Sequence, residues 1–155
     1  AALLEEARAA EARAAAHAKR SMSKAEILKS EGNDLFKAAR FEEAIAKYTQ
    51  ALDACESLES PVAVAIFNNR AACHQQLSAF GRVVDDTTMV LEAEPENLKA
   101  LLRRALAFEG LEKYRSALAD VRHVLSIDPS HPIANQLQHR VGSIIRTLKE
   151  ERPTV

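Results

Sequence analysis

The 155-residue chain has few residues that form turns and little that would hold a metal or a redox centre. It contains no Trp, 5% aromatic residues, 4 Gly and 5 Pro. This composition excludes a many-stranded β fold and requires a core built largely from aliphatic side chains and Ala. The two cysteines, Cys55 and Cys73, form no metal-binding or redox motif, and no His has metal-ligand spacing with them. We therefore expect no cofactor and no metal.

An excess of charge of one sign and a long apolar run are also missing. The 21 basic and 22 acidic residues give a formal net charge of -1, which argues against nucleic-acid binding by broad phosphate neutralisation. No apolar run approaches the roughly 18–20 residues that a membrane-spanning helix needs, and the N-terminal residues do not resemble a secretory signal. We expect no membrane insertion and a cytoplasmic location.

What the sequence does have is helix-forming residues arranged in a repeat. Ala, Leu, Glu and Lys are abundant, which favours helices over strands. The interval from Pro95 to Pro129 equals the interval from Phe80 to Tyr114. A third copy lies earlier at a longer interval, because five additional residues near Pro61 separate it from the second. The spacing predicts three helix pairs, near 24–38 and 41–56, 62–78 and 81–93, and 97–110 and 114–127.

A small residue recurs at the eighth position of each copy, as Gly32, Ala71 and Ala105. A small side chain on the first helix of a pair lets the second helix approach closely. After Pro132, apolar residues recur at helical spacing and predict one amphipathic capping helix over 132–149. Those apolar residues are Ile133, Leu137, Val141, Ile144 and Leu148.

Residues 1–22 have a different character from the rest. Ten of the first twenty residues are Ala, and the only large apolar ones are Leu3 and Leu4. Such a segment favours helix but lacks the apolar stripe needed for docking. We expect an Ala-rich helical extension or linker over 1–22, followed by a repeat domain over 23–150. Its repeats are expected at about 25–58, 64–97 and 98–131.

A period of about 34 residues with a small residue at the eighth position resembles the tetratricopeptide repeat. The resemblance covers residues 25–131 in three in-register copies, although the Trp of the pattern is missing and the second copy is the most divergent. It implies an all-α fold: a right-handed superhelical solenoid of three helix pairs plus a C-terminal capping helix. The first helix of each pair then lines a concave face.

Hydrogen-bond donors from three successive helices are expected to converge on that face. Lys29 and Asn33 are four residues apart, as are Lys99 and Arg103, so each pair points the same way from its helix. Asn69 lies on the helix between them. An anion with two carboxylates suits this set of donors, because charge-assisted hydrogen bonds are the strong ones.

The same five residues match the carboxylate clamp of tetratricopeptide co-chaperones at all five positions. The chain looks similar to the tetratricopeptide domains of the chaperone-organising protein, the myosin chaperone and a mitochondrial-import co-chaperone. This resemblance implies a partner: the acidic C-terminal Glu-Glu-Val-Asp tail of heat shock protein 90 or heat shock protein 70. Lys29, Asn33 and Asn69 would hold its main-chain carboxylate, and Lys99 and Arg103 would meet the terminal Asp side chain.

Other residues have more than one interpretation. Phe36 belongs either to the core or to the groove edge, where it would contact the tail. Leu102 and Leu106 either pack in the core or form an apolar groove floor, and Gln76 lies near the expected peptide path with a weakly specified role. Asp85 and Asp86 are interpreted as a solvated helix face rather than an acid–base pair.

Three classes of function remain. The leading hypothesis is a peptide-binding co-chaperone module that is not an enzyme. The alternative is an assembly scaffold whose groove holds an internal segment of another partner protein. The two differ in whether the ligand needs a free α-carboxylate. An enzyme fragment is disfavoured because the sequence contains no catalytic constellation.

Overall fold

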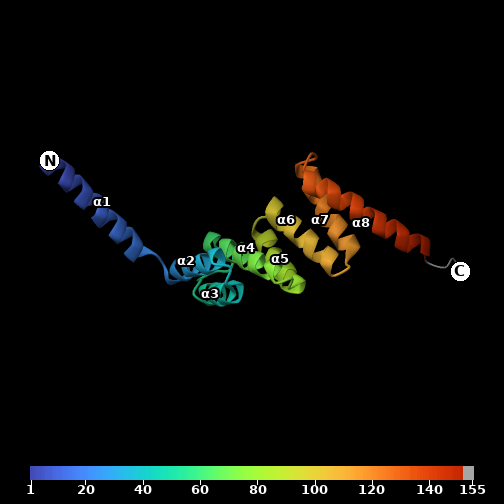
Figure 1. Ribbon diagram of the computed structural model, residues 1–155, viewed down its shortest axis with the longest axis horizontal. Helices are drawn as coiled ribbons and strands as arrows, with labels where there is room; N and C mark the ends of the chain where they lie inside the picture. Colours follow the sequence, from blue (N-terminus) through green and yellow to red (C-terminus); the bar gives the residue numbers. More distant parts are fainter. Residues whose placement is uncertain (152–155) are drawn as a thin grey trace.

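The computed structural model describes the backbone of residues 1–151 and the side chains of residues 1–14 and 22–151. Helices account for the regular structure of that part of the chain, and it contains no strand. They are α1 (Ala2–Ser21), α2 (Lys24–Lys37), α3 (Phe41–Asp53), α4 (Pro61–Gln76), α5 (Phe80–Ala93), α6 (Leu98–Gly110), α7 (Tyr114–Ile127) and α8 (Pro132–Glu151). Figure 1 shows α1 projecting from one end of a stack of helix pairs and α8 lying at the other end. The predicted all-α, right-handed solenoid is confirmed.

Successive helices pack as antiparallel pairs, which we call A and B helices. The pairs are α2 with α3, α4 with α5, and α6 with α7, and each B helix also packs against the helix that follows it. The observed helix ends differ from the predicted ones by at most three residues. The largest difference is at α3, which ends at Asp53 instead of residue 56, with Ala54 as its C-cap.

The A helices begin with side-chain caps, and the B helices do not. Ser23, Ser60 and Asn97 each accept a hydrogen bond from the backbone N–H three residues further on. Such caps satisfy backbone donors that the helix itself leaves unpaired. No B helix has a side-chain cap, so its start depends on the turn that joins it to the A helix.

That turn has the same backbone conformation in all three repeats. Ala39, Ser78 and Glu112 have φ angles of 59°, 53° and 59°, in the left-handed region. The residue after each of them donates its N–H back into the A helix, as Arg40 does to the Leu35 carbonyl at 2.9 Å. This is the usual way to end a helix, but Gly normally occupies the left-handed position. Each repeat therefore carries a strained residue at its tip.

Close packing within a pair depends on the eighth position. A Cβ on Gly32 would lie 2.6 Å from the ring of Tyr48 on α3, so only Gly fits there. Ala71 and Ala105 occupy the equivalent positions and are fully buried. The smaller Thr87 and Val121 stand where the first repeat has Tyr48, which leaves room for a methyl group on the A helix. The predicted close approach is confirmed at Gly32.

Helix α8 covers the last pair with a narrower stripe than predicted. Ala134, Leu137 and Val141 are buried against α7 as part of the core. Ile133 and Leu148 are each 48% exposed, so their predicted place in the apolar contact is wrong. Helical spacing identifies residues on one broad side of a helix, but a single neighbouring helix covers only the middle of that side.

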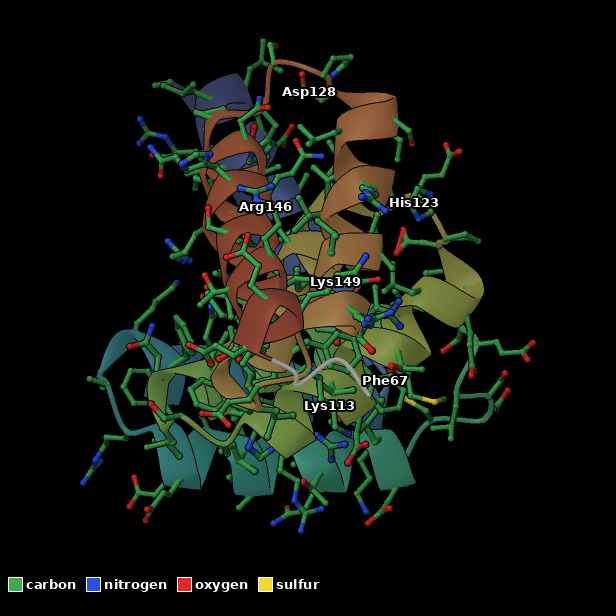
Figure 2. All side chains as sticks on the ribbon, turned by 90° about the vertical axis from the view of Figure 1, so that its right-hand side faces the viewer. Phe67, Lys113, His123, Asp128, Arg146 and Lys149 are labelled. Carbon is green, nitrogen blue, oxygen red and sulfur yellow. The ribbon has the colours of Figure 1, made fainter. Side chains whose placement is uncertain are left out.

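On its other side, α8 has polar residues at positions where α6, the preceding A helix, has apolar ones. Leu101 and Ala105 of α6 are buried at the contact with α7, whereas the equivalent Asn135 and His139 of α8 are exposed. Figure 2 views the molecule from this end and shows α8 beside α7, with Arg146 and Lys149 projecting from α8. A solenoid requires such a polar outer face where stacking stops.

Helix α1 stands apart from the other helices in the structure. It makes no extensive contact with α2–α8, and Leu3 and Leu4 are 82% and 57% exposed. The assignment of residues 1–22 as a separate extension stays a prediction. No helix in the described residues is both long and apolar enough to span a membrane.

The strain in the left-handed turns can be tested by replacing two adjacent alanines with Gly, because we expect opposite effects on stability. We expect Ala39→Gly to raise the free energy of unfolding by about 0.5–1 kcal/mol, because Gly adopts a positive φ without steric cost. Ala38, with φ −83°, is the matched control. We expect Ala38→Gly to lower stability, since there Gly only adds entropy to the unfolded chain. Urea unfolding of both variants is the measurement. If Ala39→Gly destabilised the protein, Ala39 would not be strained in the wild type.

Candidate functional site

The candidate site lies on the concave face formed by the A helices α2, α4 and α6. Consecutive A helices contact each other directly, in addition to their B partners. Lys29 and Asn33 come from α2, Asn69 from α4, and Lys99 and Arg103 from α6. Lys99 is exposed and the other four are half-buried. These residues were predicted to form one site, and side-chain hydrogen bonds join their three helices.

The first of these bonds connects α2 with α4. The Asn69 side-chain Nδ2 donates to Asn33 Oδ1 at 3.0 Å. The hydroxyl of Tyr48 on α3 donates to the same oxygen at 2.6 Å. An amide oxygen accepts two hydrogen bonds, so Asn33 Oδ1 is saturated and its NH₂ group is left for a ligand.

The second set connects α6 with α4. Arg103 Nε donates to Gln75 Oε1 at 3.0 Å, and Arg103 Nη1 lies 3.5 Å from the Asn68 carbonyl oxygen. Both acceptors are neutral, so the positive charge of Arg103 is not compensated by them. Partial burial lowers the pKa of the Arg103 guanidinium, although an Arg stays charged in proteins. A half-buried, uncompensated cation is a favourable place for an anionic ligand.

The amide pair opens into a small hollow of about 250 Å³. It is lined by Asn33, Phe36, Lys37, Tyr48, Asn69 and Ala72. The ring of Phe36 packs edge-on against Phe41 at 5.4 Å between centroids. Phe36 therefore contributes both to the core and to the groove edge, so the two interpretations of this residue do not exclude each other.

The remaining predicted ligand contacts lie further along the face. Leu102 and Leu106 are half-buried and pack against the core, while part of each side chain stays accessible. Gln76 is exposed at the last residue of α4. Contact of Leu106 and Gln76 with a peptide stays a prediction.

Cations dominate the charge of this face. Neither Lys29 nor Lys99 forms an ion pair with another residue in the described part of the chain. Glu109 lies on the same face of α6, but Arg140 of α8 neutralises it through two hydrogen bonds of 2.6 and 2.8 Å. Two carboxylates of a ligand would therefore meet positive charge without displacing a protein carboxylate.

A second polar arrangement was not predicted. Arg70 Nε and Nη2 donate to the two oxygens of Asp86 at 2.9 and 2.7 Å, and Arg70 Nη1 donates to Thr49 Oγ1 of the preceding repeat. Asp86 is 3% exposed, so its interpretation as part of a solvated face is wrong, while Asp85 is exposed. Because Asp86 is a buried ion-pair partner, it is not available for acid–base chemistry.

The same arrangement recurs one repeat further along the chain. Arg104 donates to both oxygens of Asp120 at 2.8 and 2.7 Å, and also to Thr88 at 3.2 Å. Each Arg directly follows a site residue, Asn69 or Arg103, and ties its A helix to two B helices. Arg70 and Arg104 are one repeat length apart, as are Asp86 and Asp120, and this shared interval was the signal that could have revealed the two ion pairs.

The first repeat carries this pair with the charges reversed. Glu31 and Lys47 occupy the positions equivalent to Arg70 and Asp86, and their side chains lie 2.9 Å apart. They are 47% and 37% exposed, so water screens the attraction. Elsewhere in the described residues, no cluster of three or more His, Cys, Asp or Glu has the arrangement of a metal site.

Comparison with known proteins identifies the class of fold. No protein-family model matches the chain. The tetratricopeptide domain of Arabidopsis OM64 is 31% identical, with a TM-score of 0.66, and the match covers 76% of this chain and 93% of that domain. The chain belongs to the tetratricopeptide-repeat family.

Three further relatives are informative. Sperm-associated antigen 1A of Danio rerio is 42% identical over 121 residues, which is 76% of this chain but 28% of that protein. The chain thus spans less than a third of the length of this relative. The first tetratricopeptide domain of Spaghetti (RPAP3), solved with the HSP90 peptide SRMEEVD, is 28% identical with a TM-score of 0.71 over 79% of this chain and 94% of that one. The second domain of human RPAP3, solved with the HSP70 peptide SGPTIEEVD, is 25% identical with a TM-score of 0.65, covering 74% and 92%.

The buried ion pair of Arg70 with Asp86 beside the site leads to a prediction about stability. We expect Asp86→Ala to lower the free energy of unfolding by about 3 kcal/mol or more, because Arg70 would keep a half-buried charge without its carboxylate. The matched control is Glu31→Ala, which removes the carboxylate of the exposed pair with Lys47 and should cost less than about 0.5 kcal/mol. Urea unfolding measures both. Similar costs for the two variants would show that burial of the Asp86 pair does not matter.

Proposed function

We propose that the chain is a peptide-binding co-chaperone module that docks the C-terminal Glu-Glu-Val-Asp tail of cytosolic heat shock protein 90, heat shock protein 70 or both. It is a binding domain, not an enzyme, and it acts in the cytoplasm. Lys29, Asn33 and Asn69 hold the main-chain carboxylate of the tail. Lys99 and Arg103 bind the side chain of its terminal Asp.

The observation that carries the proposal is the shortage of acceptors on a face rich in donors. The amide NH₂ of Asn33, the ammonium groups of Lys29 and Lys99, and the guanidinium of Arg103 lack a carboxylate partner within the described residues. A ligand with two adjacent carboxylates supplies the acceptors. The hydrogen bonds of Asn33 to Asn69 and of Arg103 to Gln75 hold two of these donors in place before binding, which reduces the entropy lost on association.

The relatives support the identity of the ligand. The two RPAP3 domains, which share the fold, were solved with HSP90 and HSP70 peptides that both end in Glu-Glu-Val-Asp. The hollow suits the Val of such a tail, because Phe36 and Ala72 give it an apolar part next to Asn33 of the proposed carboxylate site.

Removal of one donor tests the proposal. We expect Lys29→Ala to reduce affinity for a free-acid peptide ending Met-Glu-Glu-Val-Asp by about 30-fold or more, since a partly desolvated carboxylate would lose its partner. The wild-type dissociation constant is expected on the order of micromolar, because a flexible peptide must be ordered. Lys113→Ala, which removes the same charge at the start of α7, should bind as the wild type does. Calorimetry gives the affinities.

The ligand offers the complementary change. Amidation of the peptide C-terminus should weaken binding about as much as Lys29→Ala does, and the two losses should not add, because both delete one interaction. Equal binding of the amidated and free peptides by the wild type would reject the carboxylate clamp. It would favour the alternative of a scaffold that holds an internal segment of a partner.

Salt distinguishes ionic from apolar recognition. We expect the affinity to fall roughly tenfold between about 0.05 M and 0.5 M NaCl, because the charged contacts are partly exposed and screened. Calorimetric titrations at several salt concentrations measure this, with the chloride replaced by acetate in one series to separate screening from anion competition. An affinity that does not change with salt would assign recognition to the apolar surface of Phe36, Leu102 and Leu106 instead.

A further inference from the structure

Tyr48 is a core residue whose polar end reaches the groove. Its side chain is 1% exposed and packs between α2 and the core of the first repeat. Tyr48 nevertheless contributes to the lining of the hollow beside Asn33, and its hydroxyl donates to Asn33 Oδ1 at 2.6 Å. That hydrogen bond is shorter than the one from Asn69 to the same oxygen, at 3.0 Å.

Gly32 makes this reach possible. Any side chain at position 32 would meet the Tyr48 ring, since a Cβ would lie 2.6 Å from Cε1 and 2.8 Å from Cδ1. The equivalent pairs in the other repeats are Ala71 with Thr87 and Ala105 with Val121, whose side chains are too short to cross the A helix. Only the first of the three repeats combines Gly with a residue that extends to the concave face.

The Tyr48 hydroxyl also remains a donor over the physiological range. Burial raises the pKa of Tyr48, and the neighbouring Cys73 raises it further. Cys73 is fully buried, and burial raises the pKa of its thiol to about 11, so neither group ionises near neutral pH. The hydroxyl proton is thus present near neutral pH to engage the Asn33 oxygen.

The orientation of the Asn33 carboxamide decides what a ligand meets. The two ends of this group are similar in size, so packing alone discriminates poorly between them. With the oxygen turned toward Tyr48 and Asn69, the NH₂ group faces the groove and donates. In the flipped orientation, the oxygen would face the groove and repel a carboxylate.

We propose that Tyr48 is a positioning residue for the peptide site: its hydroxyl holds the Asn33 carboxamide with the NH₂ group toward the ligand carboxylate, and Gly32 provides the space. This inference rests on the proposed function, because it assigns Asn33 to the carboxylate. Tyr48 acts through Asn33 and does not touch the carboxylate itself.

The test is Tyr48→Phe, which deletes the hydroxyl and keeps the ring. We expect the affinity for the free-acid peptide ending Met-Glu-Glu-Val-Asp to fall about five- to tenfold, the amount expected for loss of one hydrogen bond and its orienting effect. The matched control is Tyr114→Phe, because Tyr114 is half-buried and its hydroxyl forms no hydrogen bond within the described residues. Its affinity should equal that of the wild type, and thermal melts should show both variants folded.

A double-mutant cycle separates positioning from a general structural role. On the Asn33→Ala background, Tyr48→Phe should have no further effect on affinity, because the group that Tyr48 orients is gone. If Tyr48 only supported the helix pair, its loss would weaken binding by the same factor on both backgrounds. Equal factors on the two backgrounds would therefore overturn the inference.

Failure of the inference and failure of the proposed function are distinguishable. If the wild type prefers the free acid over the amidated peptide but Tyr48→Phe binds within about twofold of it, the positioning role is wrong and the clamp stands. If the wild type does not discriminate between the two peptides, the clamp is wrong and the role of Tyr48 falls with it.

Discussion

The structure depends on the close approach of the two helices in each repeat at a small residue of the A helix. Gly32, Ala71 and Ala105 permit it. Gly32 faces the long side chain of Tyr48, whereas the two Ala residues face shorter side chains on their B helices. Because these contacts bring each A helix into a fixed relation with its partner, consecutive pairs stack with their A helices side by side. The concave face therefore exists as a consequence of core packing, before any ligand binds.

Two sets of polar links stabilise that face from different sides of the A helices. On the concave side, Asn33 with Asn69 and Arg103 with Gln75 connect neighbouring repeats. One residue further along each helix, Arg70 and Arg104 bind carboxylates of their own repeat and a Thr of the preceding one. Adjacent positions on a helix point about 100° apart, so one position is left for the proposed ligand while the next holds the helix. A site supported in this way would lose little conformational freedom on binding the proposed peptide.

The sequence predicts much of this architecture because the signals involved are periodic. Helix pairs, their small contact residues and the capping helix all follow from spacing, and the observed ends lie within three residues of the predictions. The errors concern burial. Ile133 and Leu148 share the apolar spacing of α8 yet are exposed, and Asp86 is buried although it follows another acidic residue. Burial of a side chain depends on which neighbouring helix covers it, and a pattern within one helix carries no information about that neighbour.

The sequence by itself determined the repeat and the class of fold, because both follow from residue type and spacing, and it predicted the five donors. Only the tertiary structure decided how those donors are held. Tyr48 and Asn33 are 15 residues apart on different helices, and their hydrogen bond requires the distance of approach that Gly32 allows. The pairing of Glu109 with Arg140, 31 residues away, likewise removes a negative charge from the face. Hydrogen bonds form over about 3 Å, a precision that depends on the packing of whole helices and is absent from any local pattern.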